Sequence, residues 1–202
     1  MVQNQLPVHI VTHRLTGPRL NVLYPVVVGL PRPAVQQRIN NDILAQTHML
    51  IKQQGYPENP LTESSGHYEL KTNERNILSL SQFNYAFSGG AHGLTLQKSL
   101  TFNVQTGKSY ALGELFKPGS NYAAVLNAII ERQIKERNIP LLVGYPGIRP
   151  DQDYYIADKA LVIYFAVNEL TAYVYQFTYF PISVYEIQSV IDENGPLGKM
   201  IP

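Results

Sequence analysis

Residues 83–107 read FNYAFSGGAHGLTLQKSLTFNVQTG, and this stretch indicates how the chain folds. Two runs with strand-like spacing flank a glycine-rich turn at residues 88–93. The aromatic residues before the turn alternate with polar or small residues, as on a half-buried strand, and a second set of apolar positions follows it. The sequence therefore predicts two strands joined by a turn in which Gly89, Gly90 and Gly93 adopt backbone angles that a side chain would disfavour.

The composition excludes several classes of function. The chain has 202 residues, a formal net charge of +1 and 15% charged residues. A nucleic-acid-binding protein would show a basic face, so the charge balance argues against that class. Cysteine is absent, which excludes disulfides, thiol catalysis and cysteine-ligated metals. No apolar run reaches the ~18 residues that a membrane-spanning helix needs.

Apolar spacing along the chain predicts an α+β fold. Residues 34–53 and 120–137 carry apolar stripes at helical spacing, and the other apolar runs have the length of strands. The order of these elements predicts two strand–helix–strand–strand units, each an antiparallel sheet with one helix packed on it. We expect an N-terminal α+β subdomain over residues 1–88 and a C-terminal α+β subdomain over residues 89–202.

Three shorter elements complete the expected C-terminal half. Residues 109–116 have the pattern of a short strand, residues 171–182 predict the last long strand, and residues 184–191 predict a short helix. We expect the tail over residues 193–202 to be mobile.

The predicted last strand carries a row of aromatic residues. With a period of two, the row would share one strand face, and Tyr164 would lie on a neighbouring strand. Core packing and a contact surface for protein or sugar explain such a row equally well. The row consists of Tyr173, Tyr175, Phe177 and Tyr179.

His92 is the only ionisable residue inside the glycine-rich turn. It could titrate near neutral pH at the mouth of the turn, or it could tie the turn together through a backbone carbonyl. Asp151 and Asp153 alternate as ligands of a hard cation would, but further ligands are missing. The sequence contains no phosphate-binding loop, dinucleotide fingerprint, zinc-protease helix or nucleophile elbow. We therefore expect no catalytic residue, cofactor or metal site.

Several stretches carry a family resemblance: SGGAHG (88–93), LTFNVQTGK (100–108), LGELF (112–116), LVIYF (161–165), NEL (168–170) with Tyr173, and FPI (180–182). Together they resemble the extracytoplasmic domain of RsiV-type anti-sigma factors. The resemblance extends over residues 8–191 and is most specific in the glycine–histidine turn. The family includes a lysozyme-sensing anti-sigma factor and the front portion of a peptidoglycan deacetylase. In the tyrosine-rich stretch, Ala172 and Gln176 replace the proline and glycine of the family.

The resemblance implies a non-catalytic binding or sensing module that works outside the membrane. We expect a secreted or surface-tethered protein, with its leader or anchor outside the given sequence, that binds a lysozyme-like envelope protein or a peptidoglycan fragment. Two alternatives remain open: an enzyme or accessory domain on cell-wall polysaccharide that uses His92 with a carboxylate such as Glu169, and a purely structural domain. The expected ligand-binding residues are Gly89, Gly90, His92, Tyr164, Glu169, Tyr173 and Tyr175.

Overall fold

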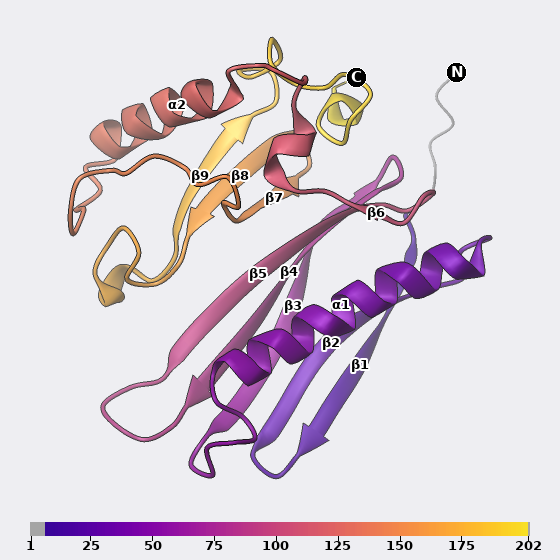
Figure 1. The fold of residues 1–202 in the computed structure, drawn as a ribbon, viewed down its shortest axis with the longest axis vertical. Coiled ribbons are helices and arrows are strands. Elements are labelled where there is room, and N and C mark those ends of the chain that lie inside the picture. The colour runs from indigo at the N-terminus through magenta and orange to yellow at the C-terminus, as the bar shows by residue number, and fades with distance from the viewer. Residues whose placement is uncertain (1–6, 202) are drawn as a thin grey trace. The chain divides into compact units, whose positions relative to one another are not determined.

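The protein is described by a computed structural model over residues 7–201, and its chain divides into two compact units (Figure 1). Unit 1 is Met1–Ser109 and unit 2 is Tyr110–Pro202. We expected the chain to divide after residue 88. That position lies in a turn between two paired strands of unit 1, and the observed division comes after Ser109. Two α-helices and two sheets within the described residues confirm the α+β class. None of the described helices is long and apolar enough to cross a bilayer.

Unit 1 contains a six-stranded sheet whose strands follow chain order. Neighbouring strands are antiparallel, except that β2 and β3 run parallel over three residue pairs. This mixed sheet corrects the expectation of purely antiparallel pairing, and it arises because the helix α1 connects β2 to β3. The elements are β1 (His9–Gly17), β2 (Leu20–Val28), α1 (Pro33–Gln53), β3 (Glu63–Glu74), β4 (Ile77–Phe87), β5 (Leu94–Asn103) and β6 (Lys108–Ser109).

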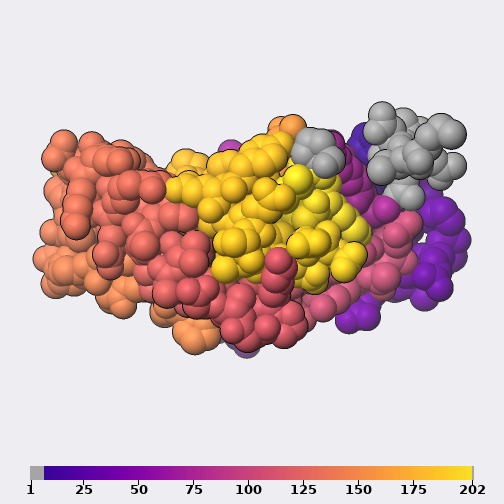
Figure 2. All heavy atoms as spheres, turned by 90° about the horizontal axis from the view of Figure 1, so that it is seen from above, coloured from indigo at the N-terminus to yellow at the C-terminus, as the bar shows by residue number. Residues whose placement is uncertain are grey.

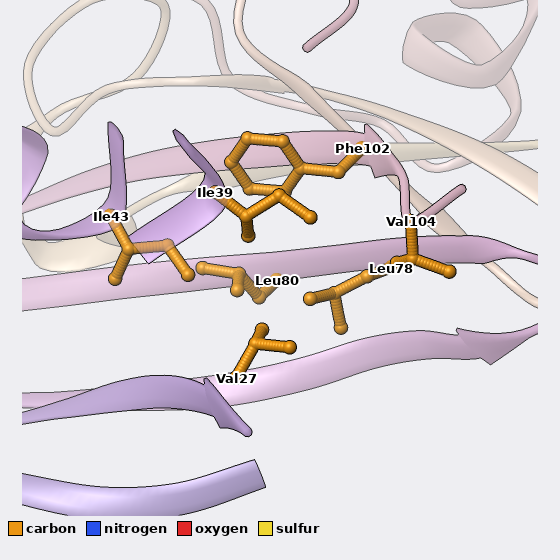
Figure 3. Packing of buried hydrophobic residues seen from close by; sticks show 7 residues of the cluster. All are labelled: Val27, Ile39, Ile43, Leu78, Leu80, Phe102 and Val104. Atoms are coloured by element: carbon orange, nitrogen blue, oxygen red, sulfur yellow. The ribbon is translucent and has the colours of Figure 1, made fainter. Parts of the chain in front are cut away.

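Helix α1 packs its apolar stripe on one face of this sheet. Pro33 opens the helix, where the fixed angle of proline suits the first turn and its missing N–H needs no partner. Ile39 and Ile43 are fully buried among strand residues, as Figure 3 shows. Each such buried aliphatic side chain contributes roughly 1.5–3 kcal/mol. The strand residues of this core are Val27, Leu78, Leu80 and Phe102, together with Val104 just after β5.

Two hydroxyl pairs join β4 to β5 directly across the sheet. Ser79 lies opposite Thr101 and Ser81 lies opposite Ser99, with 2.8 Å between the side-chain oxygens of each pair. Ser79, Ser81 and Thr101 are buried, so each hydroxyl satisfies its partner in place of water.

Unit 2 has a three-stranded antiparallel sheet in the order β7-β8-β9. Its helix α2 precedes all three strands, so the expected second strand–helix–strand–strand unit is wrong. The predicted strand over residues 109–116 contains only the end of β6, which pairs with β5 of unit 1, followed by a 3-10 turn. The elements are η1 (Leu112–Leu115), α2 (Tyr122–Glu136), β7 (Tyr154–Ala157), β8 (Ala160–Phe165), η2 (Tyr173–Tyr175), β9 (Thr178–Ser183) and η3 (Gly198–Met200).

The C-terminal segment after β9 packs against the other elements of unit 2. The helix expected over residues 184–191 is a series of turns, and the tail expected to be mobile includes the fully buried Leu197 and Met200. The backbone N–H of Asp192 donates to the carbonyl of Leu115 at 3.1 Å. Figure 2 shows this segment, in yellow, beside the coral surface that contains α2 and η1.

Candidate functional site

The structure separates the expected ligand-binding residues into two groups. Gly89, Gly90 and His92 lie in the turn between β4 and β5 of unit 1, and the others lie in unit 2 on β8 and on the segment that joins β8 to β9. Each group is therefore described within its own unit.

The glycine-rich turn has the predicted backbone at two of its three glycines. Gly89 and Gly90 have φ values of +89° and +106°, a region that L side chains rarely adopt. For Gly93 the prediction is wrong, because its φ is not positive; this position instead needs glycine because a Cβ would collide with the ring of Tyr85. The exposed His92 has its Nδ1 3.1 Å from the carbonyl of Gly93, the next residue in the chain.

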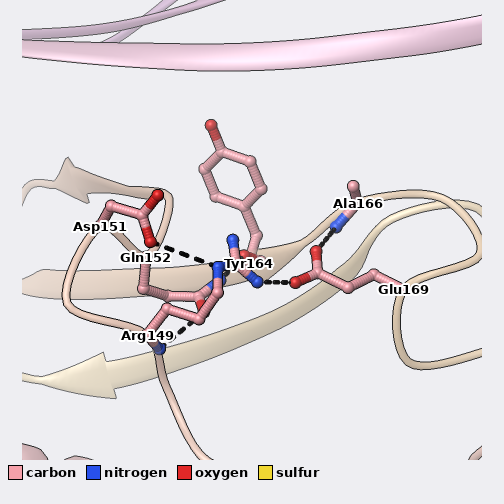
Figure 4. A network of polar contacts seen from close by, with 6 residues as sticks. All are labelled: Arg149, Asp151, Gln152, Tyr164, Ala166 and Glu169. Atoms are coloured by element: carbon pink, nitrogen blue, oxygen red, sulfur yellow. Dashed lines mark hydrogen bonds and ion pairs between the residues drawn. The ribbon is translucent and has the colours of Figure 1, made fainter.

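Glu169 belongs to a polar network that connects the loop before β7 to the loop after β8 (Figure 4). One carboxylate oxygen forms an ion pair with Arg149, and the other accepts a 2.7 Å hydrogen bond from the backbone N–H of Ala166. Arg149 also lies 3.3 Å from Asp151. Both oxygens of Glu169 thus position loops. Within residues 7–201, no cluster of three or more His, Cys, Asp or Glu side chains is arranged to hold a metal ion.

Gln152 is the buried centre of the same network. Its Nε2 donates to the carbonyl of Tyr164 at 2.7 Å, and its Oε1 accepts from the backbone N–H of Arg149 at 3.3 Å. The ring of Tyr164 points away from the network in Figure 4 and lies 5.8 Å from the ring of Tyr179. Because Tyr164 is only 1% exposed, it packs against other rings and offers little surface to a ligand.

The expected aromatic row does not lie on one strand, so the predicted strand over residues 171–182 is wrong in its first half. Tyr173 and Tyr175 belong to the 3-10 turn η2, and β9 begins only at Thr178. Gln176 breaks the strand because its φ of +57° and ψ of −137° reverse the chain. Its backbone N–H and its side-chain Nε2 both donate to the carbonyl of Tyr173.

A pocket of about 460 Å³ in unit 2 lies where this turn meets the end of α2. Arg137, just after the helix, donates to the carbonyl of Tyr179 at 2.7 Å, and its guanidinium lies 5.5 Å from the ring centre of Phe180. In the sequence, only the place of Arg137 at the end of a predicted helix could have indicated that it belongs to this pocket. The pocket is lined by Arg137, Asn138, Ile139, Pro140, Thr171, Tyr175, Phe177, Thr178 and Tyr179.

Two loops beside this pocket expose large apolar side chains. Residues 139–143 and 170–177, here called the paired loops, are joined by a bridge between Leu141 and Thr171 and by a 2.8 Å bond from the Leu142 N–H to the Leu170 carbonyl. The exposed fraction is 76% for Val174 and 69% for Val143. Leu142 and Tyr175 are each 54% exposed. The paired loops thus present apolar groups to solvent on a backbone held by hydrogen bonds.

A larger pocket of about 590 Å³ lies in unit 1, at the start of α1. Its charged side chain, Arg32, donates to the carbonyl of Gln105 at 3.2 Å. The pocket contains none of the residues expected from the sequence, and we therefore take the paired loops as the better candidate site.

Comparison with known proteins divides the chain in the same way. Residues 19–95, within unit 1, match a family model described as Deacetylase PdaC, and residues 113–185, within unit 2, match a model described as Protein of unknown function (DUF3298). No curated protein matches the chain.

Two solved structures have a similar fold. One is a member of the DUF3298 family from Bacteroides fragilis, with a TM-score of 0.66 and 11% identity over 98% of each chain. The other is a DUF3298 family protein from Pseudomonas aeruginosa, with a TM-score of 0.67 and 12% identity over 100% of this chain and 99% of that one. This chain thus has the fold of the DUF3298 proteins, with a C-terminal unit similar to their family model and an N-terminal unit similar to a deacetylase-linked one.

Proposed function

We propose that this protein is a non-catalytic binding module that works outside the cytoplasm and contacts a cell-envelope protein or glycan through the paired loops of unit 2. The observation that carries the proposal is the exposure of Val174 and Tyr175 on η2, beside a pocket lined by aromatic rings and Arg137. Exposed apolar groups next to tyrosine and arginine are the composition that contact surfaces favour.

The backbone hydrogen bonds of the paired loops support this proposal. The turn at Gln176 and the bridge between Leu141 and Thr171 hold the apolar side chains on an ordered backbone. A surface that is ordered before binding loses less conformational entropy when a partner docks. Tyr175 is then the central contact among the expected residues. Glu169 accepts a hydrogen bond from Ala166 in the loop after β8, and Tyr164 packs against Tyr179.

The experiment is a calorimetric titration of the protein against lysozyme and, separately, against soluble peptidoglycan fragments. We expect saturable heat with one of them. The double variant Val174→Ser/Tyr175→Ala should weaken that binding at least about fivefold, because truncating central apolar and aromatic contacts commonly costs about 1–4 kcal/mol in total.

The matched control is Tyr185→Ala, which removes a tyrosine of similar exposure (49%) from another surface of unit 2. It should leave the affinity unchanged. Equal weakening by both variants would remove the paired loops as the site, and silence from both ligands would favour a structural role over binding.

The alternative of a polysaccharide-modifying enzyme needs His92 to act with a free carboxylate. Glu169 has both oxygens engaged with Arg149 and Ala166, so it is poorly suited to transfer a proton. Release of acetate from acetylated peptidoglycan by the protein, abolished in His92→Ala, would establish this alternative and displace the binding module.

A further inference from the structure

The two edges of the unit 1 sheet differ in length. β6 forms one edge with two residues, whereas β1 forms the other with nine, and no strand in the described part of the chain pairs with its outer side. Proteins usually block a long edge with proline, lysine, a bulge or a covering element. The β1 sequence, HIVTHRLTG, has neither proline nor lysine, and its register with β2 is unbroken over nine pairs. β1 is therefore an open template for another strand.

The side chain of Asn40 shows which backbone groups of β1 point outward. It bonds both the N–H and the C=O of Val27, so Val27 cannot use them to pair with Ile10, which lies opposite. Hydrogen-bonded and non-hydrogen-bonded pairs alternate along an antiparallel ladder. Pro25, which lacks an N–H, accordingly lies opposite Thr12. The outward-directed residues of β1 are Ile10, Thr12, Arg14 and Thr16.

The open edge begins at Ile10. Just before β1, the N–H and C=O of Val8 are both bonded by the side chain of Asn73, at 2.9 Å each. Within the described part of the chain, no side chain is assigned to the outward N–H and C=O groups of the residues from Ile10 to Thr16. These groups form a regular row with which a new strand can pair.

The charge of the hairpin formed by β1 and β2 indicates what kind of segment could pair with the outer edge of β1. The first 41 residues contain no Asp or Glu, whereas β1 itself carries Arg14 and two histidines, and Arg19 follows in the turn. A segment with carboxylates is complementary to this edge. A second copy of β1 is a poorer fit, because it would bring its own Arg14 towards the same basic edge.

We propose that the outer edge of β1 binds an extended, acidic segment of a partner protein, which adds to the sheet as a seventh strand. Main-chain hydrogen bonds to the outward residues supply affinity, and Arg14 selects for carboxylates. This site lies in unit 1 and does not depend on the paired loops, so it can hold whether or not the proposed function does.

The first test measures fluorescence anisotropy with a labelled peptide of about ten residues that alternates Thr or Val with Glu. We expect it to bind, and to bind more weakly as salt is raised. The same peptide with Lys in place of Glu, or with two prolines that prevent strand pairing, should not bind. Binding of either control at equal strength, or no binding of the acidic peptide, would overturn the proposal.

Charge variants of the protein locate the contact. Arg14→Glu should weaken binding of the acidic peptide at least about fivefold, since it replaces an attraction with a repulsion. Lys135→Glu makes the same change on the exposed face of α2 and should have no effect. If both variants weakened binding equally, the peptide would be responding to the overall charge of the protein, and the proposed site at β1 would be refuted.

Amide hydrogen exchange tests the strand pairing itself. In the free protein, the amides of Ile10, Thr12, Arg14 and Thr16 should exchange quickly, and the peptide should slow all four. The alternate amides of Val11, His13 and Leu15 should be protected in both states. Protection of the outward amides in the free protein, with a dimer in sedimentation, would assign the edge to a second copy and refute the peptide site.

Discussion

The side chain of Asn40 on α1 forms two hydrogen bonds with the backbone of Val27 on β2, each 2.8 Å long. The carboxamide takes the place of a neighbouring strand, because β2 pairs with β3 only from Leu20 to Val22. One side chain thereby fixes the helix to the strand and completes the pairing of a fully buried residue.

We predict that Asn40→Leu lowers the free energy of unfolding by about 2–4 kcal/mol, because it leaves the N–H and C=O of Val27 without partners. Urea unfolding followed by circular dichroism measures the change. The control is Asn41→Ala, at an exposed neighbouring position on the same helix, which should cost less than ~0.5 kcal/mol. Similar losses in the two variants would contradict this role for Asn40.

Gly93 and Gly90 should respond differently to substitution by alanine. A Cβ at Gly93 would lie 2.5 Å from the carbonyl oxygen of Ala86, a backbone atom that cannot move aside, so we expect a loss of about 2 kcal/mol or more. At Gly90 there is open space and only the left-handed backbone opposes a side chain, so about 1 kcal/mol is expected. Thermal unfolding of both variants checks the order, and the reverse order would count against it.

Gln176→Gly should stabilise the protein. The φ of +57° and ψ of −137° at Gln176 suit glycine, and releasing this strain should raise the free energy of unfolding by about 1 kcal/mol, even after the added flexibility of the unfolded chain. Gln188→Gly, at an exposed position of unit 2 without a positive φ, should instead lose about 0.5–1 kcal/mol. Chemical denaturation of both variants measures the change in the free energy of unfolding. A loss of stability in both would show that the backbone at Gln176 is not strained.

Tyr145 should make stability depend on pH in the alkaline range. Burial, and secondarily the charge of Glu131, raise the pKa of its phenol, whose hydroxyl donates to Asn127 at 2.8 Å. In the unfolded chain the phenol of Tyr145 ionises near pH 10. Its contribution to the free energy of unfolding is therefore complete below that pH and is lost as the pH rises above it.

The measurement compares wild type with Tyr145→Phe by urea unfolding between pH 7 and pH 10.5. At pH 7 the variant should be less stable by about 1 kcal/mol, because a hydrogen bond is lost. This difference should shrink above pH 10, because only the wild type loses the contribution of a neutral phenol. A difference that stays constant over the range would contradict the raised pKa.

The two oxygens of Glu169 should be separable by substitution. Glu169→Ala loses both the ion pair with Arg149 and the bond from Ala166, and we expect a cost of about 1–2 kcal/mol. Glu169→Gln keeps an acceptor for the Ala166 N–H and should cost less than ~1 kcal/mol, since the ion pair is partly exposed. Differential scanning calorimetry distinguishes them, and equal losses would assign the effect to charge alone.

Local spacing was sufficient to predict both helices and several strands. The stripes over residues 34–53 and 120–137 correspond to α1 and α2, and the two runs that flank the turn at residues 88–93 belong to β4 and β5. These elements are determined by their own periodicity, because each buries one face or a short continuous run. Sequence reasoning could not assign β6, because its pairing with β5 in unit 1 is a tertiary contact without a local signal.

The candidate site was only partly visible in the sequence. The glycine-rich turn, which belongs to unit 1 and not to the paired loops, was predicted correctly at Gly89 and Gly90, because their positive φ values favour glycine. The break at Gln176 was not predicted, since glutamine carries no turn signal, and the aromatic row therefore looked like one strand. The bridge between Leu141 and Thr171 joins residues thirty positions apart, so the exposed loop at residues 139–143 could not be placed beside η2.

The hydroxyl pairs between β4 and β5 determine the alignment of the two strands. A slip of two residues, which would keep every side chain on its own face, places Thr101 opposite Ile77 in one direction and Ser99 opposite Phe83 in the other. Either slip sets a hydroxyl against an apolar side chain and removes a hydrogen bond from the sheet. Small polar residues thus act during folding as a check on strand alignment that an all-apolar interface of similar stability would lack.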